Sequence, residues 1–252
     1  MEADLKIFDV VDSTNDTLKE LADEGAPEGT CVLALSQRKG HGRSGRSFFS
    51  PGGGNVYMSL LLRPKADSQI DMITITAAVA TVRAIKEVLG IDAGIKWVND
   101  IIYRQRKVCG ILASMQDAGK ISRYVILGIG INVYESPDVP KDLTGKYGTI
   151  LGIPCDLSHD QMLSFAERMA RHIINGFSYF YEKDLYKEAV GIYREHCIMI
   201  GRDVEYMSGN SIRRAKVSGI DDGGGIVLET DEGSITCYDG EIRIIWDYMN
   251  LA

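Results

Sequence analysis

A glycine-rich segment between two apolar stretches constrains the fold of this chain more than any other feature. The segment, RKGHGRSGRSFFSP at 38–51, contains the spacing Gly-x-Gly-x-x-Gly at Gly40, Gly42 and Gly45. In a dinucleotide-binding fold this pattern follows a strand and opens a helix, and an acidic residue comes about 20 positions later. The apolar stretch 30–37 can supply the strand, so the residues after the loop decide the matter.

Those residues exclude the dinucleotide-binding fold. The sequence SFFSPGGG at 47–54 contains a proline and three consecutive glycines, which cannot propagate a helix. The region where the ribose-binding acid is expected is instead Leu60, Leu61 and Leu62. We therefore expect a second strand, over 55–62, rather than a helix after the loop.

The same segment concentrates positive charge in an acidic chain. The 252 residues include 28 Lys and Arg against 35 Asp and Glu, for a net charge of -7, so bulk attraction to nucleic acid or anionic lipid is not indicated. Glycines let backbone amides approach an anion, and guanidinium groups donate charge-assisted hydrogen bonds to phosphate. We favour an anion site over a merely solvated loop. The side chains concerned are Arg38, Lys39, His41, Arg43 and Arg46.

The remaining pattern predicts an α+β chain. Beyond the strands at 30–37 and 55–62, we expect strands near 93–97, 107–115 and 122–131, helices at 13–24 and 69–89, helical periodicity through 158–200, and a loop at 133–148. Turns around 104–106 and 117–119 indicate antiparallel hairpins, and Ser13 or Thr14 is placed to cap the first helix. After Gly201, short strands alternate with turns rich in Gly, Asp and Asn, which indicates a small all-β unit.

Several sequence blocks, taken together, resemble the biotin protein ligases. In order, they are Ser13-Thr14-Asn15, Gln37, GHGRSGR at 40–46 with Ser50-Pro51, KWVND at 96–100, KVCGIL at 107–112 and GIGIN at 128–132. The β-rich tail matches as well. The resemblance implies a mixed, largely antiparallel sheet with helices, like the catalytic domain of class II synthetases, over 1–200. A small SH3-like β-barrel is implied over 201–252.

By this resemblance the protein catalyses two steps. The carboxylate of biotin attacks the α-phosphate of ATP, giving biotinyl-5′-AMP and pyrophosphate, with Mg²⁺ as the implied cofactor. A lysine of a biotin carboxyl carrier protein or domain then attacks the mixed anhydride and releases AMP. Lipoate or octanoate ligation or transfer on the related fold is the alternative, and a non-catalytic biotin-sensing or dimerisation module is a third reading.

The resemblance also assigns site residues, with Arg43, Arg46 and Lys107 as the catalytic cations. The implied biotin-binding residues are Ser13, Thr14, Asn15, Gln37, Gly40, His41, Gly42, Arg43, Lys107, Gly110, Gly128 and Gly130. The implied ATP-binding residues are Arg43, Arg46, Phe48, Asn99, Asp100, Asn132 and Tyr147, with Tyr134 as the competing aromatic for adenine. Metal ligands stay unassigned. Plain helix capping is the structural alternative for Ser13 and Thr14, and close strand packing is the alternative for Gly128 and Gly130.

Departures from the family pattern mark where these assignments are weakest. His41 stands where an arginine is frequent, Phe48 replaces a tryptophan and Val98 replaces a proline. Cys109 replaces a small residue and is interpreted as a packing group. Arg243 lies two positions before the place where the family has a late arginine, which puts an ATP contact from the tail in doubt.

Location and partners follow from what the sequence lacks. The first residues contain no signal peptide, and five widely spaced cysteines form no Cys-x-x-Cys pair, so we expect a reduced, cytoplasmic protein without a membrane partner. Bifunctional members of the family carry an N-terminal helix-turn-helix domain. The Ser13-Thr14 block comes so early that we expect no nucleic-acid binding. Pairing of main sheets into a homodimer is implied by the resemblance alone.

Overall fold

The computed structural model describes residues 1–64, 70–117, 123–209 and 211–245, and is built around a large seven-stranded sheet. Its strands run in the spatial order β1-β2-β3-β7-β6-β5-β4. The β1–β2 pair is parallel and the other neighbours are antiparallel. The strands are β1 (Asp4–Val11), β2 (Thr30–Gln37), β3 (Val56–Leu62), β4 (Gly94–Lys96), β5 (Asp100–Tyr103), β6 (Arg106–Asp117) and β7 (Arg123–Ile131).

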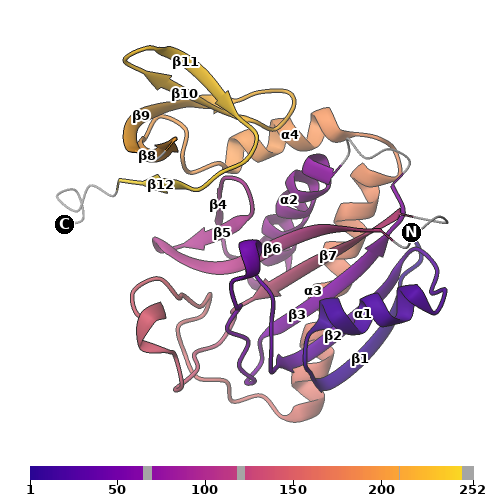
Figure 1. Ribbon diagram of the computed structural model, residues 1–252. Coiled ribbons are helices and arrows are strands. Elements are labelled where there is room, and N and C mark those ends of the chain that lie inside the picture. Colours follow the sequence, from indigo (N-terminus) through magenta and orange to yellow (C-terminus); the bar gives the residue numbers. More distant parts are fainter. Residues whose placement is uncertain (65–69, 118–122, 210, 246–252) are drawn as a thin grey trace.

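Helices cover both faces of this sheet. The helices are α1 (Thr14–Asp23), α2 (Ile70–Leu89), α3 (His159–Tyr181) and α4 (Tyr186–His196), with short 3₁₀ turns η1 (Arg43–Gly45) and η3 (Lys141–Leu143). Helix α1 packs on one face against β2, β3 and β7, whereas α2 and α3 lie together on the other face (Figure 1). Because side chains alternate between the faces of a strand, the two layers of helices need two separate apolar clusters.

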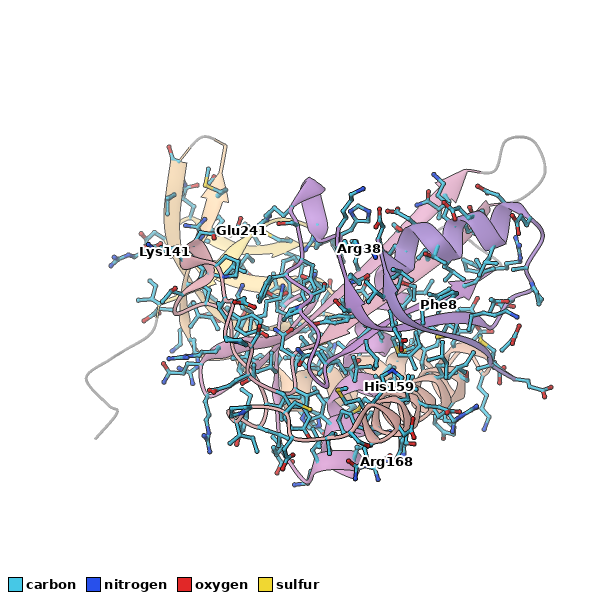
Figure 2. The ribbon with its side chains drawn as sticks, turned by 90° about the horizontal axis from the view of Figure 1, so that it is seen from below. Phe8, Arg38, Lys141, His159, Arg168 and Glu241 are labelled. Atoms are coloured by element: carbon cyan, nitrogen blue, oxygen red, sulfur yellow. The ribbon has the colours of Figure 1, made fainter. Side chains whose placement is uncertain are left out.

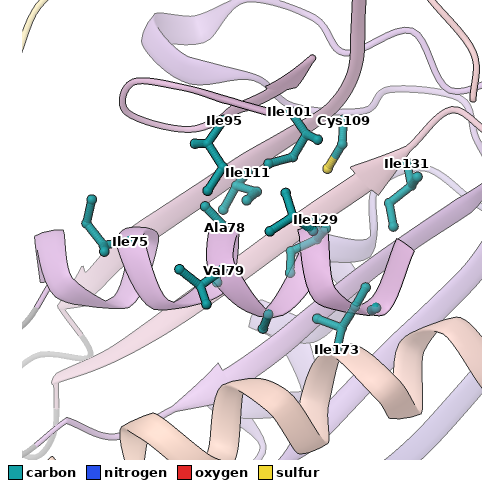
Figure 3. Packing of buried hydrophobic residues seen from close by; sticks show 14 of the residues in the cluster. Ile75, Ala78, Val79, Ile95, Ile101, Cys109, Ile111, Ile129, Ile131 and Ile173 are labelled. Atoms are coloured by element: carbon teal, nitrogen blue, oxygen red, sulfur yellow. The ribbon is translucent and has the colours of Figure 1, made fainter. Parts of the chain in front are cut away.

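The larger cluster lies between the sheet and the α2–α3 layer. Ala78 and Val79 of α2 face Ile111 and Ile129 of the sheet, and Ile173 approaches from α3 (Figure 3). The side chains of all five are at most 2% exposed. The smaller cluster lies under α1 and consists of Leu18, Ala22, Val32, Leu61, Tyr124 and Ile126. The sheet is therefore packed by apolar side chains on both of its faces.

A second sheet follows α4, with the order β11-β10-β9-β8-β12. Its strands are β8 (Asp203–Ser208), β9 (Ser211–Ile220), β10 (Ile226–Thr230), β11 (Gly233–Cys237) and β12 (Ile242–Ile244). It lies beside α4 and β4 at one end of the molecule (Figure 1). Nε1 of buried Trp97 donates to the carbonyl of Gly224 at 2.9 Å, and the Arg194 guanidinium donates to the carbonyl of Ile220 at 2.7 Å and pairs with Asp222. These contacts fasten the small sheet to the larger unit.

The structure confirms most of the expected elements. The strand at 30–37 and the helices at 13–24 and 69–89 are found within a residue or two, the hairpin around 104–106 joins β5 to β6, and Ser13 is the α1 cap. The turn expected around 117–119 falls mostly outside the described residues, although β6 and β7 pair as a hairpin requires. The strand at 4–11 was not expected, because its sequence does not alternate regularly between apolar and polar residues. It forms an edge strand parallel to β2, with Ile7, Phe8 and Val10 exposed.

The strand expected near 93–97 is found as β4, and it is followed by a strand that was not expected, β5. Strand β4 ends at Lys96, and Trp97 to Asn99 turn the chain so that β5 returns antiparallel to β4 from Asp100. Within the described part of the chain, no helix is long and apolar enough to cross a membrane.

Candidate active site

The basic loop, residues 38–51, joins β2 to β3 and contains only the single turn η1. The amide of Gly42 donates to the carbonyl of Arg46 at 2.7 Å, and the amide of Phe48 donates to the carbonyl of Gly40 at 2.8 Å. A Cβ on Gly40 would lie 2.5 Å from the Phe48 carbonyl oxygen, so the loop closes on itself only with glycine there. This compact loop replaces the helix of a dinucleotide-binding fold, as expected from its proline and glycines.

A cavity opens between the basic loop, the start of α1 and the middle of the large sheet. Three strand glycines make room in it. A Cβ on Gly130 would lie 2.4 Å from the Phe48 ring, one on Gly110 would lie 2.9 Å from it, and one on Gly128 would lie 2.5 Å from Asn15 Oδ1. The residues around this glycine pocket are Thr14, Asn15, Gln37, His41, Gly42, Arg43, Phe48, Met58, Asn99, Lys107, Gly110, Ile111, Leu112, Gly128, Ile129 and Gly130.

The pocket wall is polar on one side and apolar on the other. Gln37 accepts hydrogen bonds from the backbone amide of Thr14 at 2.8 Å and from its hydroxyl at 3.0 Å. Phe48 and Leu112 contribute apolar side chains to the lining, whereas the side chains of Met58 and Ile129 belong to the core cluster on the α2 side of the sheet. Such a pocket suits a ligand with a small polar head and an apolar body, because a few placed polar groups fix orientation while apolar walls supply contact area.

Lys107 lies at the mouth of the glycine pocket. Its ammonium is 2.6 Å from Oδ1 of Asp100 and lies over the Phe48 ring, 5.9 Å from the ring centre. The second oxygen of Asp100 lies 3.8 Å from Nζ of Lys96. One carboxylate thus faces two ammonium groups, which leaves net positive charge at the junction.

The arginines of the basic loop reach the second sheet. Arg43 donates to Asn99 Oδ1 at 3.4 Å and pairs with Asp239 at 2.5 Å, and Arg46 pairs with Glu241 at 3.5 Å. In Figure 2 the labelled Glu241 lies on the far side of the basic loop from Arg38. The turn between β11 and β12, which contains Asp239 and Glu241, therefore helps to hold the cationic side chains.

A larger groove continues from the pocket, with which it shares Gln37, Phe48 and Lys107. The other residues that line it include Gly40, Arg46, Phe49, Lys96, Asp100, Arg104, Arg106, Asn132, Lys146, Tyr147 and Arg243. Cationic side chains outnumber carboxylates along this lining. A polyanion is the ligand that this charge distribution favours.

Two buried polar atoms in the groove lack a partner in the described part of the chain: Asn132 Oδ1 and the Tyr147 hydroxyl. Burial raises the pKa of Tyr147 to about 12, so its hydroxyl stays neutral. The ring of Tyr147 packs edge-on against Phe49, 5.5 Å between ring centres. Tyr134, the competing aromatic, is instead buried against Phe165 in the core. Asn132 and Tyr147 thus keep unused hydrogen-bonding capacity inside the groove.

Of the predicted site residues, only Ser13 is absent from the linings of both cavities. It is buried, and its hydroxyl caps α1 by accepting from the Asp16 amide at 3.4 Å. His41 lies at the pocket edge, where its imidazole contacts Asp16 at 2.7 Å.

Sequence reasoning missed several residues that the structure brings to the site. Ser59, Lys96 and Asp239 are examples, and Lys96 of the KWVND block had a visible signal in its motif. Arg243, whose role was in doubt, lines the groove.

Two kinds of chemistry have little support in the described residues. Cys109 is fully buried and its burial strongly raises the pKa of the thiol, so it packs rather than reacts, as expected. Among the described residues, no three His, Cys, Asp or Glu side chains are grouped to hold a metal ion. The groups that can act are the cations, the carboxamides and Asp100.

Together, the mixed sheet and the pocket that opens into a cationic groove are typical of a protein that binds a small, partly apolar ligand beside a polyanion. The family model "Biotin/lipoate A/B protein ligase family" matches residues 7–132. The bifunctional ligase/repressor BirA of Bacillus subtilis is 36% identical over 244 residues, which cover 94% of this chain and 72% of that protein. The chain belongs to the biotin/lipoate A/B protein ligase family.

Two further relatives match almost end to end. The biotin–[acetyl-CoA-carboxylase] ligase of Paracoccus denitrificans is 29% identical over 234 residues, covering 88% of this chain and 92% of that protein. The biotin protein ligase of Aquifex aeolicus, solved in complex with biotin and ATP, superposes with a TM-score of 0.79 at 28% identity, covering 97% of this chain and 99% of that one.

Proposed function

We propose that this protein is a biotin–protein ligase that forms biotinyl-5′-AMP from biotin and ATP and transfers biotin to a lysine of a carrier protein. The observation that carries the proposal is the position of Lys107, which lines both the glycine pocket and the cationic groove. Biotin has a polar ureido ring, an apolar body and a carboxylate tail. The polar side of the pocket suits the ring, and the mouth with Lys107 suits the tail.

The first step brings together two anions, the biotin carboxylate and the triphosphate. Lys107 at the junction, with Arg43 and Arg46 on the basic loop, offsets their repulsion and stabilises charge that develops on the α-phosphate. A carboxylate oxygen then forms a bond to the α-phosphorus as the bond to the β-phosphate oxygen breaks, and pyrophosphate leaves. Asp100 holds the Lys107 ammonium in place from 2.6 Å.

In the second step, the amine of an acceptor lysine attacks the activated carbonyl of biotin. An amide forms, AMP leaves, and the amine loses one proton. Asn99 and Asp100 are the polar groups at the junction that face this chemistry, and the proton that the amine loses passes to solvent. We propose a biotin carboxyl carrier protein or domain as the acceptor, on the strength of the substrate named for the Paracoccus relative.

The groove is proposed as the ATP site. Asn132 Oδ1 supplies an acceptor for the adenine amino group, and Tyr147 with Phe49 supplies an aromatic surface for the base. Phe48 lies between the two ligands, with its ring against Lys107. Mg²⁺ fits the site only as a companion of ATP, because among the described residues Asp100 is the one carboxylate paired with Lys107. Magnesium is usually held by one or two carboxylates together with phosphates and water, and it would neutralise triphosphate charge.

The organisation of the chain is part of the proposal. Residues 1–200 form the catalytic unit, and 201–252 form a small SH3-like β-barrel, supported by the antiparallel order of β8 to β12. The ion pairs from Asp239 and Glu241 to the basic loop give that small unit a part in the site. Free, mostly buried cysteines fit a reducing, cytoplasmic location. The absence of operator binding and the homodimer remain predictions.

A single assay separates the candidate functions. The protein is incubated with ATP, Mg²⁺ and either biotin or lipoate, with and without an apo carrier domain, and pyrophosphate release and carrier mass are followed. We expect biotin-dependent pyrophosphate release and a mass gain of one biotinyl group on the carrier. Lipoate-dependent transfer alone would establish the alternative ligase, and biotin binding without pyrophosphate would leave a sensor.

A further inference from the structure

Ser59 lies under the polar side of the glycine pocket and is fully buried on β3. Its hydroxyl oxygen is 2.7 Å from the Thr14 hydroxyl oxygen and 2.6 Å from Oδ1 of Asn15. Gly128 is the direct cross-strand neighbour of Ser59 and leaves the space that the Asn15 carboxamide occupies. Ser59 therefore contacts two pocket residues and stands outside the family blocks on which the site was predicted.

The hydrogen bonds beyond Thr14 fix its direction. The backbone carbonyl of Phe48 can only accept, so the Ser50 hydroxyl donates to it, at 2.9 Å. The Ser50 oxygen then accepts from Nε2 of Gln37 at 2.8 Å, which turns the Gln37 carboxamide oxygen towards Thr14. The Thr14 hydroxyl must donate its one proton to that oxygen. Towards Ser59, the Thr14 hydroxyl can act only as an acceptor.

The same proton count decides the role of Asn15. Ser59 has one hydroxyl proton and donates it in the hydrogen bond to Thr14, so towards Asn15 the Ser59 oxygen can only accept. A carboxamide carries its donor and its acceptor in nearly interchangeable positions. When Nδ2 of Asn15 faces Ser59, each contact along the chain Gln37, Thr14, Ser59 and Asn15 contains one donated proton. Oδ1 of Asn15 then faces the pocket.

We propose that Ser59 is a positioning residue that sets the hydrogen-bonding polarity of the biotin pocket. Through Ser59, Asn15 presents an acceptor, and Gln37 presents the second N–H of its carboxamide as a donor. A cyclic urea has an N–H donor beside a carbonyl acceptor, and this pair matches the two groups. The proposal rests on the proposed biotin ligase function and deepens it.

The proposal also explains how the pocket tells a cyclic urea from an apolar ring. A ring without N–H and carbonyl groups, such as the dithiolane of lipoate, would leave the oriented Asn15 and Gln37 groups unpaired. Sites built to hydrogen-bond a ligand reject analogues that lack the matching groups, because desolvated polar groups then lose their partners. Without the hydrogen bond from Ser59, Asn15 could turn its carboxamide, and the discrimination between biotin and lipoate would fall.

A double-mutant cycle tests this role. Ser59→Ala, Thr14→Val and the double variant are compared with Thr81→Ala, a matched control in which a buried hydroxyl that bonds Ala77 within α2 is removed far from the pocket. The KM values for biotin and for ATP, kcat and Tm are measured for each. We expect each single pocket variant to raise the KM for biotin by about tenfold with little change in kcat or in the KM for ATP.

If Thr14 and Ser59 act through one chain of hydrogen bonds, a relay, removing either hydroxyl interrupts it. The KM for biotin of the double variant should then be no higher than that of the single variant with the higher KM. Effects on the KM for biotin that multiply in the double variant would overturn the proposal. So would a Ser59→Ala variant that matches Thr81→Ala, or one whose two KM values rise together as Tm falls. If the wild-type protein itself shows no biotin-dependent pyrophosphate release, the proposed function fails and the relay fails with it.

Discussion

Gly130 allows the sharpest test of how the pocket is built. It lies on β7 between its cross-strand partners Tyr57 and Gly110, and a Cβ added to it would lie 2.4 Å from the Phe48 ring. Ordinary contact begins at 3.4 Å, so in Gly130→Ala the ring must move by about 1 Å, the difference between these distances. The ring cannot simply swing away, because it packs edge-on against Tyr57 and its amide is bonded to Gly40.

The expected cost has two parts. Overpacking of this kind costs about 1–3 kcal/mol of stability, a drop in Tm of a few degrees for a chain of this size. Because Phe48 also contacts Lys107, a shift of about 1 Å at the reacting centre should lower kcat/KM for biotin by about 100-fold. Both are measured, by thermal unfolding and by biotin-dependent pyrophosphate release.

Gly191 provides the matched control. It lies inside α4, and a Cβ there would meet nothing within 4 Å. Gly191→Ala should therefore raise stability by about 1 kcal/mol, because alanine has the higher helix propensity, and leave kcat/KM unchanged. If Gly130→Ala keeps kcat/KM within about threefold of the wild type, the idea that Phe48 and the glycines shape the pocket is wrong.

Three further outcomes follow from the same geometry. Lys107→Met keeps the apolar stem but removes the charge, so kcat for pyrophosphate release should fall by about 100- to 1000-fold; a fall below tenfold would mean that Lys107 is peripheral. Asp239→Asn frees Arg43 from its ion pair, so trypsin should cut the ligand-free basic loop faster, while the KM for ATP should fall only a fewfold because the pair is exposed; unchanged proteolysis would contradict this. A hydrogen bond to Asp9 raises the pKa of His159, so their pairing adds stability below about pH 6.5 that is lost as pH rises through the raised value; His159→Gln should flatten that part of the Tm–pH curve, and an unaltered curve would refute the pairing.

Much of the fold followed from local sequence because its causes are local. The proline and glycines after the basic loop exclude a helix whatever surrounds them, and β2, α1 and α2 were located within a residue or two. The edge strand β1 was missed for an equally physical reason. It pairs on one side only, and its exposed apolar side chains carry neither the alternation nor the burial that mark a strand.

The candidate site likewise has a part that the sequence predicted and a part that only the structure shows. Motifs predicted the basic loop and Lys107, but not which groups they meet. Arg43 and Asp239 are 196 positions apart, and no local pattern indicates their ion pair. The resemblance favoured Tyr147 over Tyr134 in the loop at 133–148, but only packing shows that Tyr134 enters the core while Tyr147 lines the groove.

The sequence alone therefore determined where the backbone must turn, where charge gathers and where strands lack side chains. The tertiary structure decided what the absent side chains make room for: the Phe48 ring above Gly110 and Gly130, and Asn15 above Gly128. The physical reason is that a glycine in the sequence already shows where a side chain is absent and where the backbone has more conformational freedom. The atoms that fill the space come from segments tens of residues away, and their approach depends on how the whole sheet and its helices pack.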